Sequence, residues 1–184
     1  YHAQPVRGFS ETADWLRMVG RLYGKTAEAE QVIAEKQLQY RNQIDALKPL
    51  YKNKKVLFFL NNKIIDWIFE LSRDLDWNVV DSILIGSKED RTIDWRHQFS
   101  KDWDGNLESL KKSIAEKKPD LIILNHSIAQ ACIPADIFTA NLSRDVGSGF
   151  FAGTECALRW SQLFENSLEG RWKHDKSIFE KLCR

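Results

Sequence analysis

The sequence predicts an α/β protein in which two helices, the second one long, lead into a Rossmann-like, doubly wound and mostly parallel sheet. Residues 10–51 carry apolar side chains at helical spacing, and from Lys54 onward short apolar runs such as KVLFFL and LIIL alternate with amphipathic segments. Such runs are typical of parallel strands buried on both faces. We therefore divide the chain into a helical connector, residues 1–52, and a Rossmann-like α/β domain, residues 53–184.

The first helix is expected to begin at Ser10, a favourable N-cap residue, and to end at Gly24, because glycine commonly follows a helix C-terminus. Its apolar side chains fall on one face, which comprises Trp15, Leu16, Val19, Leu22 and Tyr23. The segment is therefore predicted to be an amphipathic helix.

The second helix is expected to begin at Thr26 and to run for roughly 24 residues, or about 36 Å. Its apolar positions follow a spacing of four and three, with Gln37 as the one polar member of Ile33, Gln37, Tyr40, Ile44, Leu47 and Tyr51. This stripe either packs on the protein's own domain or forms a coiled-coil or subunit interface.

A β-α-β unit follows the long helix. KVLFFL, residues 55–60, reads as a buried strand, and Asn61 and Asn62 come directly after it. Apolar residues between 64 and 75 line one helix face, and NVVDSILIG, from Asn78, reads as the next strand. The two strands should therefore lie parallel in one sheet.

The rest of the chain continues this alternation, after a segment, residues 86–106, that we interpret as a long surface loop. The elements expected next are a helix from Leu107, the strand LIIL opened by Asp120, a weak strand at DIFTA and a helix after Gly153. No internal repeat accompanies them.

Composition excludes several classes of partner. Lys and Arg number 27 against 26 Asp and Glu, so no basic surface for nucleic acid or for an anionic membrane is expected. The apolar runs are far shorter than the roughly 20 residues of a membrane span. Three widely separated cysteines fit reduced thiols in a cytoplasmic protein, and a first residue Tyr1 without a secretory signal suggests a piece of a longer protein.

Ligand-facing candidates follow from the rule that ligands bind beyond the carboxyl ends of parallel strands. The rule nominates Asn61 and Asn62 after the first strand, and Asn125 and His126 after LIIL. His126 could donate a hydrogen bond, shuttle a proton or bind a metal. The interpretation that we favour is that it caps the next helix or satisfies a loop carbonyl, because no second histidine or carboxylate stands at metal-binding spacing.

A glycine-rich segment, RDVGSGFFAGTE, adds Gly149 and Gly153 to the ligand-facing candidates. It comes too late in the chain to be a dinucleotide fingerprint, which needs its glycines directly after the first strand. The alternative is a tight loop that lets a helix start close to the sheet. No recognisable cofactor motif is therefore present.

The cysteines and the catalytic residues are less informative. Cys132, in a turn before Pro134, is the one candidate for thiolate chemistry or iron–sulfur ligation, whereas Cys156 reads as a small core residue and Cys183 as a terminal one. No linear pattern identifies a catalytic triad or a carboxylate pair, so the catalytic residues are unknown and enzymatic activity is not established.

Three stretches resemble one known family. PVRGFSETADWLRMVG is similar to its P-x-G-x-x-x-T-x-x-W-L helix entry, AEQVIAEKQLQYRNQIDALKPLYKNKKVLFF to its long helix before the third domain, and PDLIILNHS with GFFAGTECALRWSQLFENSL to its closing pattern. The family is that of the nitrogenase component 1-type oxidoreductases, which includes nitrogenase molybdenum-iron proteins and protochlorophyllide reductase relatives. The resemblance covers most of the chain.

The resemblance implies that the chain is the C-terminal part of an oxidoreductase subunit, contributing scaffold, cavity wall and subunit contacts and being inactive alone. It implies a homologous subunit as partner and an ATP-dependent iron–sulfur reductase as electron donor. An iron–sulfur or related metallocluster would be held by upstream cysteines. The sequence departs from the family at Leu60, Asn61 and Asn62, which replace a glycine-bearing loop, and FTANLSRDVGSGFF lacks the cofactor histidine.

Two other functions remain open on the sequence. One is a small-ligand or nucleotide-sugar binding α/β domain without a redox role, with the long helix as a hinge or dimer element. The other is a purely structural assembly domain.

Overall fold

The structure is a computed structural model that describes residues 6–61, 66–85, 101–102, 107–124, 133–134, 137–142 and 147–165. The helices in these ranges are α1 (Phe9–Leu22), α2 (Thr26–Tyr51), α3 (Asp66–Asp74), α4 (Leu107–Lys117) and α6 (Ala152–Glu165). The strands are β1 (Lys55–Asn61), β2 (Asn78–Ile85), β3 (Lys101–Asp102), β4 (Leu121–Leu124) and β5 (Phe138–Asn141).

The strands form a single sheet in the order β3-β2-β1-β4-β5, and each neighbouring pair is parallel. The sheet grows first in one direction from β1 and then in the other, which is the doubly wound arrangement. The predicted Rossmann-like α/β fold, with two helices before it, is confirmed, as is the parallel pairing of the first two strands.

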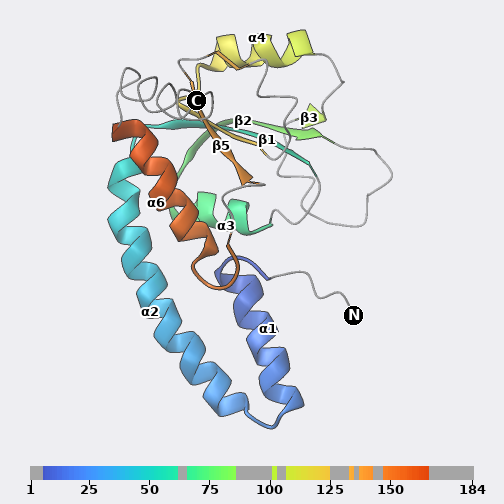
Figure 1. Ribbon diagram of the computed structural model, residues 1–184, viewed down its shortest axis with the longest axis vertical. Coiled ribbons are helices and arrows are strands. Elements are labelled where there is room, and N and C mark those ends of the chain that lie inside the picture. The colour runs from blue at the N-terminus through green and yellow to red at the C-terminus, as the bar shows by residue number, and fades with distance from the viewer. Residues whose placement is uncertain are drawn as a thin grey trace, which may run out of the picture.

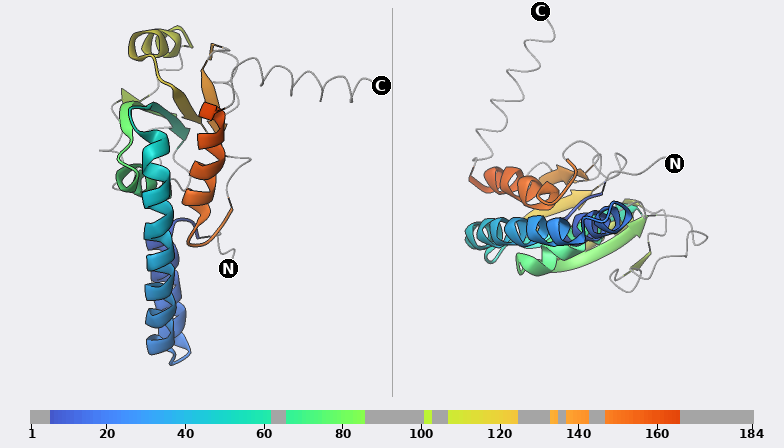
Figure 2. Two further views of the ribbon diagram at one scale, coloured as in Figure 1. Left: turned by 90° about the vertical axis from the view of Figure 1, so that its left-hand side faces the viewer. Right: turned by 90° about the horizontal axis from the view of Figure 1, so that it is seen from below.

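Helices cover both faces of the sheet, so the domain has three layers. Helices α3, α6 and the end of α2 lie on one face and α4 lies on the other (Figures 1 and 2). The side chains of β1 alternate between the layers: Phe58 packs with α2, α3 and α6, and Phe59 packs with α4. Residues 56–60 are completely buried because both faces are covered, as the continuous apolar run predicts.

A β-bulge in β2 brings a carboxylate into the layer under α4. Val56 pairs with Val79 but Leu57 pairs with Asp81, so one extra residue enters β2 at this point. The Asp81 carboxylate is buried and accepts hydrogen bonds from the Ser113 hydroxyl of α4, at 2.6 Å, and from the Ser82 backbone N–H, at 3.0 Å. This buried polar group therefore ties α4 to the sheet.

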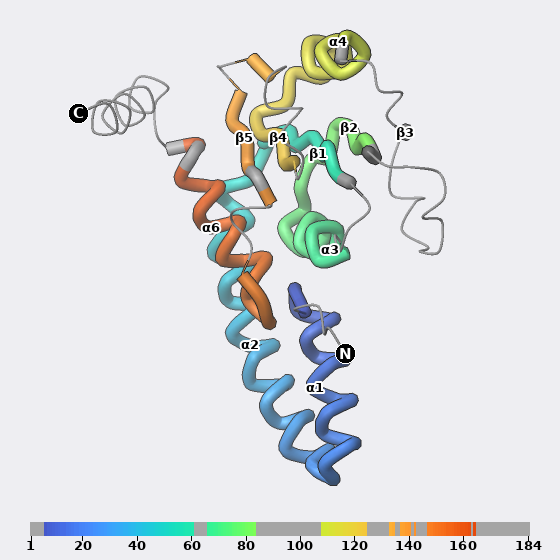
Figure 3. The backbone as a smooth tube through the Cα atoms, turned by 45° about the vertical axis from the view of Figure 1, so that its right-hand side comes forward, coloured from blue at the N-terminus to red at the C-terminus, as the bar shows by residue number. Residues whose placement is uncertain are grey.

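Helix α2 spans 26 residues, about 39 Å. Its N-terminal half projects beyond the sheet and forms a helical hairpin with α1 (Figure 3). The apolar stripe predicted for this helix is buried within the chain, with Gln37 exposed. Two hydrogen bonds fix α2 on α6: the Tyr51 hydroxyl donates to the Ala157 carbonyl at 2.6 Å, and the Thr154 hydroxyl contacts the Gln43 side chain.

Two expectations from the sequence are wrong in detail. Ser10 is not the N-cap of α1, because the helix begins at Phe9 after Gly8, and its first N–H groups are satisfied by a side chain of α3 instead. The segment 86–106 is not entirely a loop, because Lys101 and Asp102 add an edge strand to β2. Both features depend on contacts with residues far away in the sequence.

Candidate functional site

The carboxyl edge of the sheet is the first candidate site. Strands β1 and β4 are neighbours although they are not consecutive, and Phe59 pairs with Leu124 at their ends. The strand order reverses between these two strands, and ligands of open α/β sheets bind outside this reversal point. The tertiary structure thus brings the ends of β1 and β4 together at the edge that the sequence nominated.

The residues predicted to face a ligand are only partly covered by the structure. Asn61 is the last residue of β1, so its backbone lies at the carboxyl edge. Asn62, Asn125, His126 and Cys132 lie outside the described residues. Their roles stay predictions.

Gly149 links the glycine-rich segment to the start of the chain. Its N–H donates to the Val6 carbonyl at 2.8 Å, and it forms a parallel bridge with Arg7, whose Nε donates to the Gly147 carbonyl at 3.3 Å. Its φ of 87° lies in the left-handed region that glycine adopts without strain. Gly149 therefore connects the glycine-rich segment to the start of the chain. Whether it also faces a ligand stays a prediction.

Gly153 lies in the first turn of α6 and faces α3. A Cβ at this position would lie 3.4 Å from the Trp67 ring and 3.5 Å from Leu71, which are ordinary van der Waals distances, so an alanine would also fit here. A ligand-binding role for Gly153 stays a prediction.

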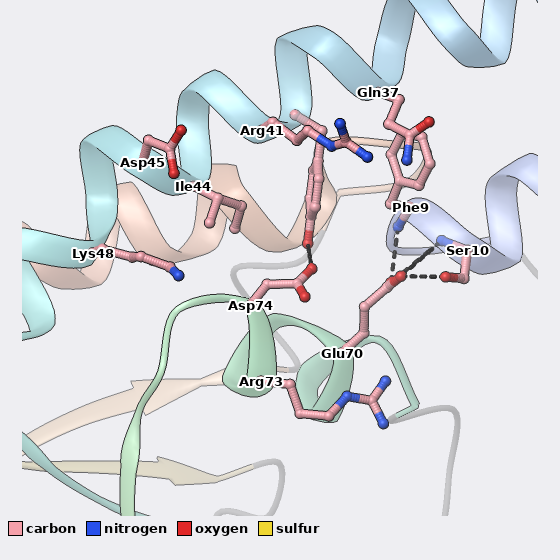
Figure 4. A pocket seen from close by; sticks show the side chains of 11 residues that line it. Phe9, Ser10, Gln37, Arg41, Ile44, Asp45, Lys48, Glu70, Arg73 and Asp74 are labelled. Atoms are coloured by element: carbon pink, nitrogen blue, oxygen red, sulfur yellow. Dashed lines mark hydrogen bonds between the residues drawn. The ribbon is translucent and has the colours of Figure 1, made fainter.

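A second candidate site is a surface pocket of about 520 Å³ between α1, α2 and α3 (Figure 4). The start of α1, the middle of α2 and the end of α3 contribute its lining. The residues are Phe9, Ser10, Gln37, Tyr40, Arg41, Ile44, Asp45, Lys48, Glu70, Arg73 and Asp74. Three cationic and three anionic side chains are among them, so the pocket has no net formal charge.

Glu70 of α3 caps the N-terminus of α1. Its carboxylate accepts hydrogen bonds from the backbone N–H groups of Phe9 and Ser10, each at 3.0 Å, and from the Ser10 hydroxyl. A carboxylate at this position satisfies N–H groups that have no partner inside the helix and interacts favourably with the helix dipole. Glu70, which lines the pocket, therefore serves to cap α1.

Tyr40 of α2 and Asp74 of α3 both line the pocket. The Tyr40 hydroxyl donates to Asp74 Oδ2 at 2.7 Å (Figure 4). Burial of the phenol, and then its hydrogen bond to the carboxylate, raise the pKa of Tyr40 far above its usual value. The phenol therefore stays protonated and joins α2 to α3 rather than acting as a base.

Neither Glu70 nor the Tyr40–Asp74 pair is evident from the sequence. Glu70 reads as an ordinary polar position of an amphipathic helix, and its partners lie 60 and 61 residues away. Asp81 left a weak signal, since it is the charged residue within an apolar strand. The contacts of all three depend on tertiary packing and could not be derived from local spacing.

The described residues do not offer ligands for a metallocluster. Among them, no three His, Cys, Asp or Glu side chains are gathered as a metal centre would require. Cys156, a residue of α6, is completely buried in the core, as the sequence predicts, and its Sγ lies 3.6 Å from the Arg159 guanidinium. This thiol is part of the packing and does not fit the ligand set of a cluster.

Comparison with known proteins decides the family. The family model for nitrogenase component 1 type oxidoreductases matches residues 1–142, from the start of the chain through β5. The chain belongs to this family. The resemblance noted in the sequence is thereby confirmed, and the domain can be described as nitrogenase-like.

Solved structures support the same fold for this nitrogenase-like domain. A structure of nitrogenase Cp1 at pH 5 matches with a TM-score of 0.55 and 15% identity, over 92% of this chain and 42% of that one. A structure of nitrogenase Cp1 at pH 6.5 matches with a TM-score of 0.54 and 14% identity, over 91% of this chain and 44% of that one. The chain thus spans less than half the length of the proteins it matches, and at these identities the likeness concerns the fold.

Two further findings complete the comparison. A search among curated proteins finds no match to the sequence of this nitrogenase-like chain. Within the described residues, no helix combines the length with the apolar character that crossing a membrane requires.

Proposed function

We propose that this nitrogenase-like chain is the C-terminal domain of a component 1-like oxidoreductase subunit, in which it contributes scaffold, one wall of a cofactor or substrate cavity, and subunit contacts. The observation that carries the proposal is the family match over residues 1–142, which includes the helical connector and every strand of the sheet. The chain's size supports it, because the chain corresponds to 42–44% of the matched nitrogenase chains.

The cavity wall is assigned to the carboxyl edge of the sheet, where β1 and β4 end side by side. Ligands of doubly wound sheets bind at this edge, and Asn61 lies there. We place Asn62, Asn125 and His126 at the same wall, because they follow these two strands in the sequence. The polar pocket at α1, α2 and α3 is assigned to the scaffold, since its Tyr40–Asp74 pair joins two helices.

Family membership supports proposals for the cofactor, the partners and the location of the full-length subunit. We propose that the full-length subunit holds an iron–sulfur or related metallocluster, with ligands outside the residues described here. The subunit would assemble with a homologous subunit in the cytoplasm and receive electrons from an ATP-dependent iron–sulfur reductase. This domain alone would not turn over.

Anaerobic purification of the natural protein that contains these residues, through an affinity tag on this chain, tests the proposal. Iron and acid-labile sulfide, an electron paramagnetic resonance signal after reduction with dithionite, and a co-purifying homologous subunit are the expected results. A tagged protein that is folded but carries neither iron nor a homologous partner would overturn it.

The doubly wound topology also favours one alternative function. The reversal point between β1 and β4 is the usual binding position for nucleotides and small ligands, so a small-ligand or nucleotide-sugar binding domain without redox role is the second candidate. Thermal unfolding of the chain with nucleotides, nucleotide sugars and free sugars separates the two. The component 1-like function predicts no shift in Tm, whereas a saturable rise with one ligand would support the alternative.

A further inference from the structure

A largely apolar surface pocket of about 520 Å³ lies at the amino edge of the sheet, between α4 and the start of β5. Its apolar lining residues are Ile114, Ala115, Pro119, Pro134, Ile137 and Phe138. Two further lining residues fix its position, since Asp120 directly precedes β4 and Ile137 directly precedes β5. Ala115 of α4 is exposed and Ile137 is half-buried, so apolar surface is open to a binding partner here.

The pocket adjoins an edge of the sheet. Within the ranges that the structure describes, β5 is the last strand on this side and pairs with β4 alone. Proteins usually cover such an edge with a helix or a loop, because its free backbone groups would otherwise pair with other chains. A segment that occupied the pocket would lie against the start of β5, since Phe138, the first residue of the strand, lines the pocket.

Helix α6 leads the chain to this place. The ring centroid of Phe164, in the last turn of α6, lies 5.9 Å from that of Phe138 and 4.9 Å from the Nζ atom of Lys54, which precedes β1. The helix therefore ends beside β5, at the amino edge of the sheet (Figures 2 and 3). Residues 166–184 follow it and lie outside the described ranges. The chain thus leaves α6 next to a residue that lines the pocket.

The sequence after α6 contains an apolar segment that suits the pocket. Ser177 and Glu180 have the spacing of a capping box, S-x-x-E, which predicts a helical turn that begins at Ile178. In such a turn Ile178, Phe179 and Leu182 share one face, because they are three and four residues apart. This face is unlike the rest of the sequence from 171 onward, in which charged residues predominate.

We propose that residues 177–183 of this chain occupy the pocket, with the face of Ile178, Phe179 and Leu182 against α4 and the start of β5. A pocket of this volume has room for several apolar side chains. Residues 166–176 connect the segment to α6 and can extend over about 36 Å, which is ample for a pocket that begins at Phe138. The docked segment covers the edge of the sheet. This role goes beyond the proposed function.

Chemical cross-linking between Cys183 and α4 tests the proposal in the natural protein that contains these residues. Ala115→Cys places a thiol in the pocket, and a short bismaleimide should join it to Cys183 of the same chain. Glu116→Cys, an exposed position of α4 outside the pocket lining, is the matched control. It should react at least about tenfold more slowly, because docking raises the effective concentration of Cys183 only at the pocket. Peptide mass spectrometry identifies the linked pair.

A second pair of variants tests the docked face itself. Phe179→Asp in the Ala115→Cys protein should slow the cross-link to the rate of the control, because a carboxylate is costly to bury in an apolar pocket. Lys181→Asp introduces the same side chain outside the apolar face and should leave the rate unchanged. Circular dichroism checks that each variant is folded.

Three results would each overturn the proposal: equal rates at positions 115 and 116, a cross-link that joins two chains, or a rate that Phe179→Asp does not lower. A link between two chains would show that the segment of a second copy occupies the pocket. Iron content and co-purification of a homologous subunit are separate measurements, so the proposed function can stand or fail independently of this contact.

Discussion

Gly8 is the residue at which the helical hairpin meets the α/β domain. It precedes α1 with a φ of 80°, and an added Cβ would lie 2.6 Å from the Trp67 Cβ of α3. Both the backbone conformation and the space around it therefore require glycine. The resemblance to the family motif includes this glycine, and the structure supplies the physical reason for it.

Gly8→Ala should lower the free energy of unfolding by about 3 kcal/mol, which combines left-handed backbone strain with overpacking against α3. Gly24→Ala is the matched control, because Gly24 has a φ of 65° but nothing within 4 Å of the added Cβ. That variant should lose only about 1 kcal/mol. Urea unfolding followed by tryptophan fluorescence measures both, and equal losses would contradict the steric argument.

Tyr40 and Tyr51 should make the protein sensitive to alkaline pH. Burial is the larger cause that raises the pKa of each phenol, and the hydrogen bond to Asp74 adds to it at Tyr40. Above pH 10 the unfolded chain releases these protons while the folded chain keeps them. Stability should therefore fall as pH rises, by about 1.4 kcal/mol per pH unit for each tyrosine.

Urea unfolding between about pH 9 and pH 11 checks this expectation against the usual tyrosine pKa of about 10. Tyr40→Phe and Tyr51→Phe should each make the decline less steep, whereas Tyr23→Phe, at an exposed position, should not. A decline of the same slope in all four proteins would show that other groups cause it.

At the scale of the elements, α1 depends on a neighbour for its N-terminal cap. The carboxylate of Glu70 performs the task that the sequence assigned to Ser10, and the Ser10 hydroxyl becomes one of its donors. A cap from another helix couples the formation of α1 to the packing of α3. Helix propensity alone therefore does not set the stability of α1.

Glu70→Gln should destabilise α1 by about 1–2 kcal/mol, because the neutral amide loses the charge-assisted hydrogen bonds to two N–H groups and a hydroxyl. Hydrogen exchange should then speed up by about tenfold across α1 but not in α4. Glu116→Gln removes an exposed carboxylate of α4, 3.9 Å from Lys112, and should change exchange little. Unchanged protection of α1 in Glu70→Gln would argue against the cap.

At the scale of the whole molecule, the division of the chain into a connector, residues 1–52, and a domain, residues 53–184, remains a prediction. The hydrophobic core includes residues from both parts. Tyr40, Ile44, Leu47 and Tyr51 of α2 lie in the same buried cluster as the side chains of β1, α3 and α6. The C-terminal half of α2 is therefore part of the domain's core. The chain should unfold as one cooperative unit.

Leu47→Ala should lower the free energy of unfolding by about 2–4 kcal/mol and shift the helical and tryptophan transitions together. Leu38→Ala removes an equal side chain from the same helix at an exposed position, and should cost less than about 0.5 kcal/mol. Circular dichroism and fluorescence during urea unfolding provide the two signals. Separate transitions would indicate that the hairpin unfolds by itself.

Local pattern was sufficient for most elements of the described fold. The run from Val56 to Leu60, the stripe of α2 and the strand LIIL could be predicted because burial on both faces or on one helical face leaves a periodic signal in neighbouring residues. The short edge strand β3 was missed, since two residues carry no period. Asn62, Asn125 and His126 lie outside the described residues, so that part of the candidate site is still known from the sequence alone.

The sequence by itself determined the fold class, the order of the helices and strands and the resemblance to the family, because these depend on residues close together in the chain. Only the tertiary structure decided which face of α1 is buried, which side chain caps it and which strands meet at the reversal point. Glu70 lies about 60 residues from its partners, and Asp81 lies 32 residues from Ser113. Contacts across such separations arise from packing, which leaves no local period in the sequence.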